Sequence, residues 1–144
     1  MAAETQTVTS LTSVDLQRLA KQRATVEKYL GDETSKKNYN TAAGKLGLLR
    51  ALLEQRVFKP TQTYELQCMG VVLGDAFAQE LKMEWVMVSD SYGRDPALRV
   101  PKTSIIIYPL TMISKRVEKN EKLDVFDLFN GVANQVETLR KKGV

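Results

Sequence analysis

Apolar residues recur at three- and four-residue intervals through the first half of the chain, a spacing typical of amphipathic helices. The pattern predicts one helix over residues 12–31 and a second over 41–56. The second helix has an apolar stripe wide enough for burial on two sides, formed by Leu46, Leu48, Leu49, Leu52, Leu53 and Val57. The polar stretch 32–40 is predicted to be a loop, and residues 1–10 a frayed segment.

A third helix, predicted over residues 63–81, contains the most apolar part of the chain. One of its stripes consists of Leu66, Met69, Leu73, Phe77 and Leu81. Gly70, Gly74 and Ala78 recur every four residues on another face. Each glycine weakens a helix by roughly 1 kcal/mol relative to alanine. Small residues at this spacing therefore indicate that another element packs closely against the helix backbone.

The period of the pattern changes after this helix. Residues 84–88 and 103–108 are rich in β-branched and aromatic side chains, which predicts two strands, and 98–100 is predicted to add a short third strand. The stretch 89–96 between them contains the residues that turns require, and we expect a loop there.

Two helices are predicted to close the chain, a short one after Pro109 and a longer one capped by Asp124. Because helices and strands are segregated along the sequence, the fold class is predicted to be α+β. We expect N-terminal helices packed on a small antiparallel sheet of two or three strands, followed by two C-terminal helices. No repeat or linker-like tract interrupts the sequence, so residues 1–144 are predicted to form a single domain.

Composition and charge narrow the class of protein. The chain is 43% hydrophobic and 26% charged, which is typical of globular domains. No apolar run approaches the ~20 residues that span a bilayer, and residues 1–5 lack a secretion-signal pattern. We therefore expect a cytoplasmic protein with no membrane partner. The net charge of +4 arises in residues 1–60, where the basic residues are dispersed, so no nucleic-acid partner is expected.

The sequence contains few of the residue types and motifs that catalytic sites use. It has no histidine and one cysteine, which excludes His-dependent general bases and the usual zinc sites. No phosphate-binding loop is present, and Cys68 lies on an apolar helix as an inert core thiol would. We expect no metal and no cofactor. Enzymes that use only Asp, Glu, Lys or Tyr remain an open class, but a non-enzymatic role is favoured.

Asp75 is the first residue that invites a functional reading, because it lies within the apolar run 69–78. A buried carboxylate must be paired, hydrogen-bonded or protonated. One interpretation is structural: an ion pair with Arg94 or Arg99, or hydrogen bonds from backbone amides. The other is functional: an acid or base with a shifted pKa in a ligand pocket.

The predicted loop and the strand after it gather two acids, two arginines and an aromatic ring. These candidate partner-binding residues are Asp90, Tyr92, Arg94, Asp95 and Arg99. Binding surfaces often lie on loops that a rigid scaffold presents, but turn chemistry and local ion pairs explain the same residues. Trp85 begins a predicted strand and is expected in the core.

Four segments resemble a known family. They are Met69–Phe77 (MGVVLGDAF), Glu84-Trp85, Tyr92–Arg99 (YGRDPALR) and Thr103–Pro109 (TSIIIYP). Over roughly residues 60–140 the chain resembles a family of uncharacterised bacterial proteins, a domain of unknown function. The resemblance implies a bacterial origin and a compact domain centred on this helix, loop and sheet. It implies no activity for any residue.

Three functional hypotheses follow. The first is a non-enzymatic bacterial protein-binding domain, most concretely an immunity-type protein that neutralises a partner toxin. The alternative is a small-molecule-binding protein or a His-independent enzyme that uses Asp75 with Arg94 or Arg99. The third is a scaffold that forms a homo-oligomer through the broad apolar face of the second helix.

Overall fold

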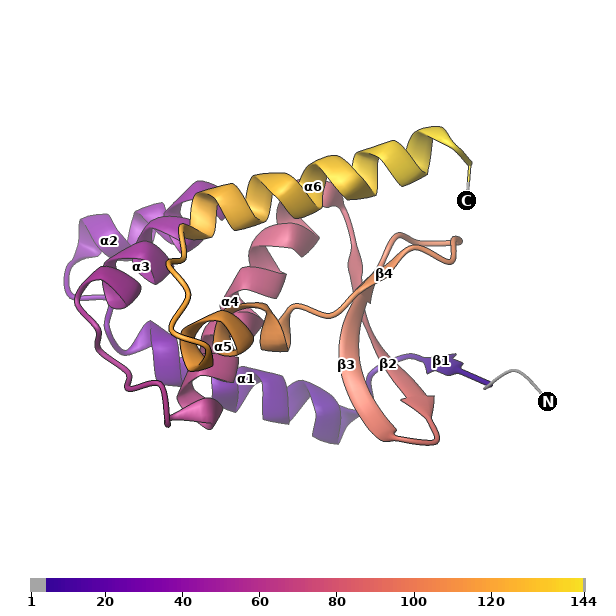
Figure 1. Cartoon of the computed structure of the whole chain (residues 1–144), viewed down its shortest axis with the longest axis horizontal. Coiled ribbons are helices and arrows are strands. Elements are labelled where there is room, and N and C mark those ends of the chain that lie inside the picture. The colour runs from indigo at the N-terminus through magenta and orange to yellow at the C-terminus, as the bar shows by residue number, and fades with distance from the viewer. Residues whose placement is uncertain (1–4, 144) are drawn as a thin grey trace.

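A computed structural model describes residues 5–143, which form six helices and four strands over that range (Figure 1). Strand β1 (Thr7–Thr9) precedes four helices: α1 (Ser13–Glu27), α2 (Glu33–Asn38), α3 (Ala42–Glu54) and α4 (Thr63–Leu81). Three strands follow: β2 (Glu84–Asp90), β3 (Gly93–Arg99) and β4 (Ile106–Ile107). Helices α5 (Leu110–Glu118) and α6 (Val125–Lys141) come last. The predicted α+β class is therefore confirmed.

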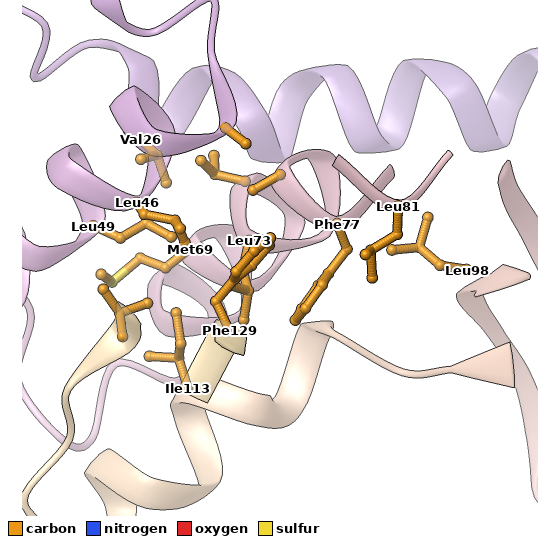
Figure 2. Close-up of a cluster of buried hydrophobic side chains, with 14 of the residues drawn as sticks. Val26, Leu46, Leu49, Met69, Leu73, Phe77, Leu81, Leu98, Ile113 and Phe129 are labelled. Atoms are coloured by element: carbon orange, nitrogen blue, oxygen red, sulfur yellow. The ribbon is translucent and has the colours of Figure 1, made fainter. Parts of the chain in front are cut away.

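Helix α4 is the central element, and apolar side chains cover most of its circumference. Leu66, Met69, Leu73 and Phe77 are each no more than 1% exposed. Helices α1, α3 and α5 pack along α4. Phe129 of α6 stacks on Phe77 with the ring centroids 4.6 Å apart, as the core view in Figure 2 illustrates. Each large apolar side chain buried here contributes roughly 1.5–3 kcal/mol, so this core dominates the stability of the fold.

The close packing predicted for the glycine face of α4 is confirmed. A Cβ atom built at Gly70 would lie 2.5 Å from the backbone oxygen of Leu110, at the start of α5. One built at Gly74 would lie 2.4 Å from the ring of Trp85. Real Cβ atoms do not approach other heavy atoms this closely. The absent side chains therefore let α5 and the Trp85 ring reach the α4 backbone.

The broad apolar stripe of the second predicted helix is used inside the fold. Leu46, Leu49 and Leu52 of α3 are buried, and Leu48 and Leu53 are partly buried against the same core. Helices α4 and α6 pack against α3. Internal packing therefore accounts for the width of the stripe, and self-association through it stays an untested prediction.

The sheet has four antiparallel strands in the order β1-β2-β3-β4, where two or three were predicted. It lies beside the helices in Figure 1, with α6 passing across one end. On one face Trp85 and Leu98 join the main core, and on the other a small cluster forms from Val86, Val88, Ala97, Val8 and Ile106. The helices thus gather around α4, with the sheet at their flank, which differs from the predicted helices-on-sheet arrangement.

Strand β1 corrects the prediction that residues 1–10 are frayed. Thr7, Val8 and Thr9 pair with Ser89, Val88 and Met87 of β2. Three β-branched residues suit a strand, but their pairing partner lies some eighty positions away, so local pattern does not reveal it. Residues 1–4 of the same predicted segment lie outside the described range.

Two further elements replace predicted loops. Helix α2 forms in the polar stretch 32–40, where the Asp32 side chain caps it by accepting a hydrogen bond from the Ser35 amide at 2.7 Å. It has no buried residue, so no apolar period marks it. Strand β3 occupies the second half of the predicted loop 89–96, because it pairs with β2 along seven positions, from Gly93 opposite Asp90 to Arg99 opposite Glu84.

The predicted strand over 103–108 is mostly irregular. Only Ile106 and Ile107 pair with β3. The preceding residues close a turn in which the Val100 amide donates to the Ile105 carbonyl at 3.0 Å. The chain reverses here within a few residues, which leaves a strand of two residues.

Candidate functional site

The Asp75 carboxylate lies in an ion pair, as the structural interpretation predicted, but with a different partner. Arg23 of α1 donates from Nε to Oδ2 at 2.5 Å and from Nη2 to Oδ1 at 2.9 Å. The indole N–H of Trp85 also donates to Oδ1, at 3.1 Å. The predicted pairing with Arg94 or Arg99 is therefore wrong. The side chain of Asp75 is 15% exposed, so a single carboxylate ties α4 to α1 and to β2.

A shallow polar hollow of about 510 Å³ lies over this ion pair. It is lined by Arg23, Glu27, Tyr39, Asn40, Lys45, Asp75, Ala78 and Gln79. Lys45 donates from Nζ to the Tyr39 carbonyl at 2.9 Å and to the Gln79 side chain at 3.0 Å. Burial lowers the pKa of Lys45. Burial, and next the nearby Glu27 carboxylate, raise the pKa of Tyr39, so its hydroxyl stays protonated.

Strands β2 and β3 form a hairpin, and Arg94 joins this hairpin to the start of α1. Its Nη1 and Nη2 donate to the two carboxylate oxygens of Asp15, both at 2.6 Å. Asp15 also accepts from the Thr12 amide at 2.8 Å, while Thr12 Oγ1 accepts from the Asp15 amide, which completes a capping box. The pKa of Asp15 lies well below its usual range, chiefly because of the hydrogen bonds from Arg94 and next because of the one from Thr12.

This pair predicts how stability depends on pH. A carboxyl whose pKa is depressed on folding stabilises the fold fully above its unfolded pKa of about 4, and that stabilisation is lost as the pH falls through the folded value. We therefore expect Asp15→Asn to melt below wild type at neutral pH. The gap should narrow as the pH falls from about 4 to about 2, in melting curves followed by circular dichroism. A gap that stays constant over this range would contradict the assignment.

Arg99, another predicted contact residue, pairs with Glu84 across the β2–β3 ladder. Its Nε and Nη2 donate to Glu84 Oε2 at 3.1 and 3.0 Å. Both side chains are about a third or more exposed, at 31% and 42%. Pairs of this kind contribute little to stability. The two arginines predicted for a pocket at Asp75 are thus bonded to other carboxylates, Arg94 to Asp15 of α1 and Arg99 to Glu84 of β2.

The remaining predicted contact residues lie at or near the hairpin turn. Asp90 accepts a hydrogen bond from the Tyr92 amide at 2.8 Å, and Gly93 has a φ of +137° that favours glycine. The Tyr92 side chain points to solvent and is 89% exposed. Asp95 is also exposed. The structure therefore brings Asp90, Tyr92 and Asp95 together at one end of the sheet and gives Arg94 a structural partner.

The sequence pattern did not identify three residues of the polar clusters as candidates: Arg23, Lys45 and Asp15. Arg23 and Asp15 are separated from their partners by 52 and 79 positions, so only the folded chain reveals the pairings. A signal did exist for Asp15, because Thr12 and Asp15 have capping-box spacing. Arg23 and Lys45 resemble ordinary exposed positions of a helix.

We also searched residues 5–143 for a reactive thiol, a metal site and a membrane-spanning helix. Cys68 is fully buried and burial raises the pKa of its thiol, which fits the predicted inert role. No group of three or more Cys, Asp or Glu side chains in this range could hold a metal ion. None of the described helices is long and apolar enough to cross a bilayer.

Comparison with known proteins places the chain in a structural context. A family model described as a domain of unknown function (DUF3806) matches residues 45–129. No curated protein matches the chain. A crystal structure of a protein from Bacteroides thetaiotaomicron is similar, with a TM-score of 0.71 and 13% sequence identity. The match covers 90% of this chain and 48% of the other, so the chain spans about half the length of that protein and shares its fold.

Proposed function

The chain belongs to the DUF3806 family, a domain of unknown function, and we propose that it acts as a non-enzymatic protein-binding domain. The contact surface is the end of the β2–β3 hairpin, which we define as Asp90, Ser91, Tyr92, Gly93 and Asp95. The hairpin lies wholly inside the matched region 45–129.

The observation that carries this proposal is the exposure of Tyr92. A tyrosine ring that is 89% exposed on a turn contributes nothing to the core of its own chain. Tyrosine is among the residues that most often dominate binding energy at interfaces, because it buries a large area at a small entropic cost. An exposed ring on a structured turn is therefore suited to enter a pocket on another protein.

The hairpin is held rigidly enough to present that ring. Seven residue pairs join β2 to β3, and the Arg94–Asp15 pair anchors the hairpin to α1 just behind the turn. A segment that is already ordered loses little conformational entropy when it binds. This anchoring also explains why Arg94 supports the contact surface without being part of it.

The chemistry of the partner follows from the charges beside Tyr92. Asp90 and Asp95 lie on either side of Tyr92 along the hairpin, and the arginine between them is neutralised by Asp15. A complementary partner presents basic side chains around an apolar pocket. Nucleic acid does not fit an acidic tip, because phosphates require cations.

The most concrete version of the proposal is an immunity-type protein that neutralises a bacterial toxin. Small bacterial domains without catalytic residues often have this role. A toxin that acts on nucleic acid carries a basic active-site surface. An acidic hairpin with a protruding ring would block such a surface.

We expect the double substitution Tyr92→Ala and Asp95→Ala to weaken binding to the partner by about 30-fold or more, the effect of a hot spot of about 2 kcal/mol. Both side chains are exposed, so the melting temperature should not change. The partner is first isolated with the tagged wild-type chain from its native host and identified, and its affinity is then measured by titration calorimetry. Arg94 is left intact because its loss would loosen the hairpin.

The matched control is Tyr64→Ala, which removes another partly exposed tyrosine ring, on helix α4, and should leave the affinity unchanged. An unaltered affinity in the hairpin variant would show that the tip is not the contact surface. Chemical turnover of the partner would contradict the non-enzymatic role. For the toxin version, wild type but not the hairpin variant should restore growth to cells that express the partner.

A small polar ligand in the hollow over Arg23 and Asp75 is the second candidate. The hollow itself favours it, and Arg23 takes the place predicted for Arg94 or Arg99. However, Arg23 is already bonded to Asp75, and Lys45 to Tyr39 and Gln79. A ligand would have to break these bonds before it gained its own. The arrangement therefore favours the protein-binding function.

A further inference from the structure

A second hollow, of about 480 Å³, lies where the end of α3, the start of α4 and the end of α5 meet. Its apolar lining consists of Leu52, Leu53, Phe58, Pro60, Leu66, Met69, Val117 and Leu123. Leu66 and Met69 are 1% exposed, so the floor of the hollow is the surface of the main core. A concave, mostly apolar site of this size is in the range of small-molecule pockets.

Two sharp turns shape the hollow. Arg56 after α3 has a φ of +50° and Asn120 after α5 has a φ of +58°. This is the left-handed conformation, which residues with a side chain adopt less readily than glycine does. These turns end the two helices abruptly and send the α3–α4 and α5–α6 connections past each other, on the same side of the molecule in Figure 1. The hollow is the space left between them.

The rim of the hollow is basic. Its charged residues are Glu54, Arg56, Lys59, Glu121 and Lys122. Arg50 lies 3.7 Å from Glu54 and also 3.6 Å from Asp124, so it is shared between these two carboxylates. The rim itself carries three cations against two carboxylates. An apolar floor below a basic rim is complementary to a molecule with an apolar body and one acidic group.

The hollow also lies entirely within the segment that defines the family. All of its lining residues fall between Leu52 and Leu123, inside the matched region 45–129. The polar hollow over Asp75, by contrast, requires Arg23 and Tyr39 from outside that region. The apolar hollow is therefore a feature that the matched segment builds by itself.

We propose that this hollow binds a medium-chain aliphatic carboxylic acid. The chain lies against the floor formed by Leu66 and Met69, and the carboxylate meets Lys59 and Lys122 at the rim. The site is separate from the hairpin, so it goes beyond the proposed protein-binding function. Either proposal can fail while the other stands.

The test is a titration of the full chain with sodium decanoate, followed by amide shifts in two-dimensional NMR. We expect saturable shifts concentrated at the lining residues. Decylammonium, which has the same chain and the opposite charge, should bind at least tenfold more weakly. The double substitution Lys59→Gln and Lys122→Gln should also weaken decanoate binding at least tenfold. Both lysines are exposed, so the fold is expected to persist, and an unchanged melting curve verifies this.

The matched control is Lys141→Gln with Lys142→Gln, which removes the same charge at the end of α6 and should leave the affinity for decanoate unchanged. Three results would overturn the proposal. They are an absence of saturable shifts, shifts centred away from the hollow, and equal binding of decanoate and decylammonium.

Discussion

Replacing Gly70 with alanine is expected to destabilise the fold by about 3 kcal/mol, at the upper end of the usual range for overpacking. The added Cβ would lie 2.5 to 2.7 Å from the oxygen, Cα and carbonyl carbon of Leu110. All three are backbone atoms, so no side-chain rotation relieves the clash. Helix α5 would have to move away from α4 and uncover part of the core. Urea unfolding followed by circular dichroism measures the loss.

Gly131 of α6 provides the matched control, because it is exposed and a Cβ there meets nothing within 4 Å. Gly131→Ala should stabilise the chain by about 1 kcal/mol, the helix propensity difference alone. The same chemical change is thus expected to have opposite signs at two helical positions. Equal effects at both positions would mean that the close approach of α5 to α4 is not as described.

Removing the carboxylate of Asp75 is expected to have an effect of similar size, a loss of about 3 kcal/mol in Asp75→Ala. The guanidinium of Arg23, whose side chain is 28% exposed, would keep its charge without its partner. The indole N–H of Trp85 would lose its acceptor as well. Both donors would remain poorly solvated, which is the costly outcome when one member of a largely buried pair is removed.

Two comparisons separate this effect from a general loss of charge. Glu84→Ala removes the carboxylate of the more exposed Arg99 pair and should lose less than about 1 kcal/mol. The double substitution Arg23→Leu and Asp75→Leu removes both charges and should recover most of the stability lost in Asp75→Ala. If Asp75→Ala is no less stable than Glu84→Ala, the hydrogen bonds that join Asp75 to Arg23 and Trp85 are not an important source of stability.

Helices with an apolar face could be predicted from the sequence, and those without one could not. The stripe of α4 and its glycine face imply a buried helix with a close neighbour, which is what α5 and Trp85 provide. Helix α2 has no buried residue, so only its cap at Asp32 marks it. Strand β3 contains turn-type residues such as Gly93 and Pro96 and forms because β2 supplies a complete pairing register.

Part of the candidate site could likewise be predicted from the sequence, and part of it could not. A carboxylate at position 75 must be compensated wherever it lies in an apolar helix, so an ion pair could be predicted. The choice of Arg23 depends on how α1 rests against α4, a tertiary property that the local pattern does not contain. Arg94 and Arg99 are close to Asp75 in sequence but are bonded to Asp15 and Glu84. The exposure of Tyr92 likewise required the folded hairpin.

The two outer strands have a consequence for how the proposed protein partner binds. Strand β1 covers β2, and β4 pairs only with Leu98 and Arg99, so within the described chain β3 has a bare edge from Gly93 to Ala97. A bare edge usually invites a foreign strand to extend the sheet. Here Pro96 lacks the amide donor that strand addition needs, and charged Arg94 and Asp95 occupy the neighbouring positions. Under the proposed protein-binding function, the partner therefore contacts side chains at this end, with the Tyr92 ring foremost, and does not extend the sheet. The same edge resists aggregation.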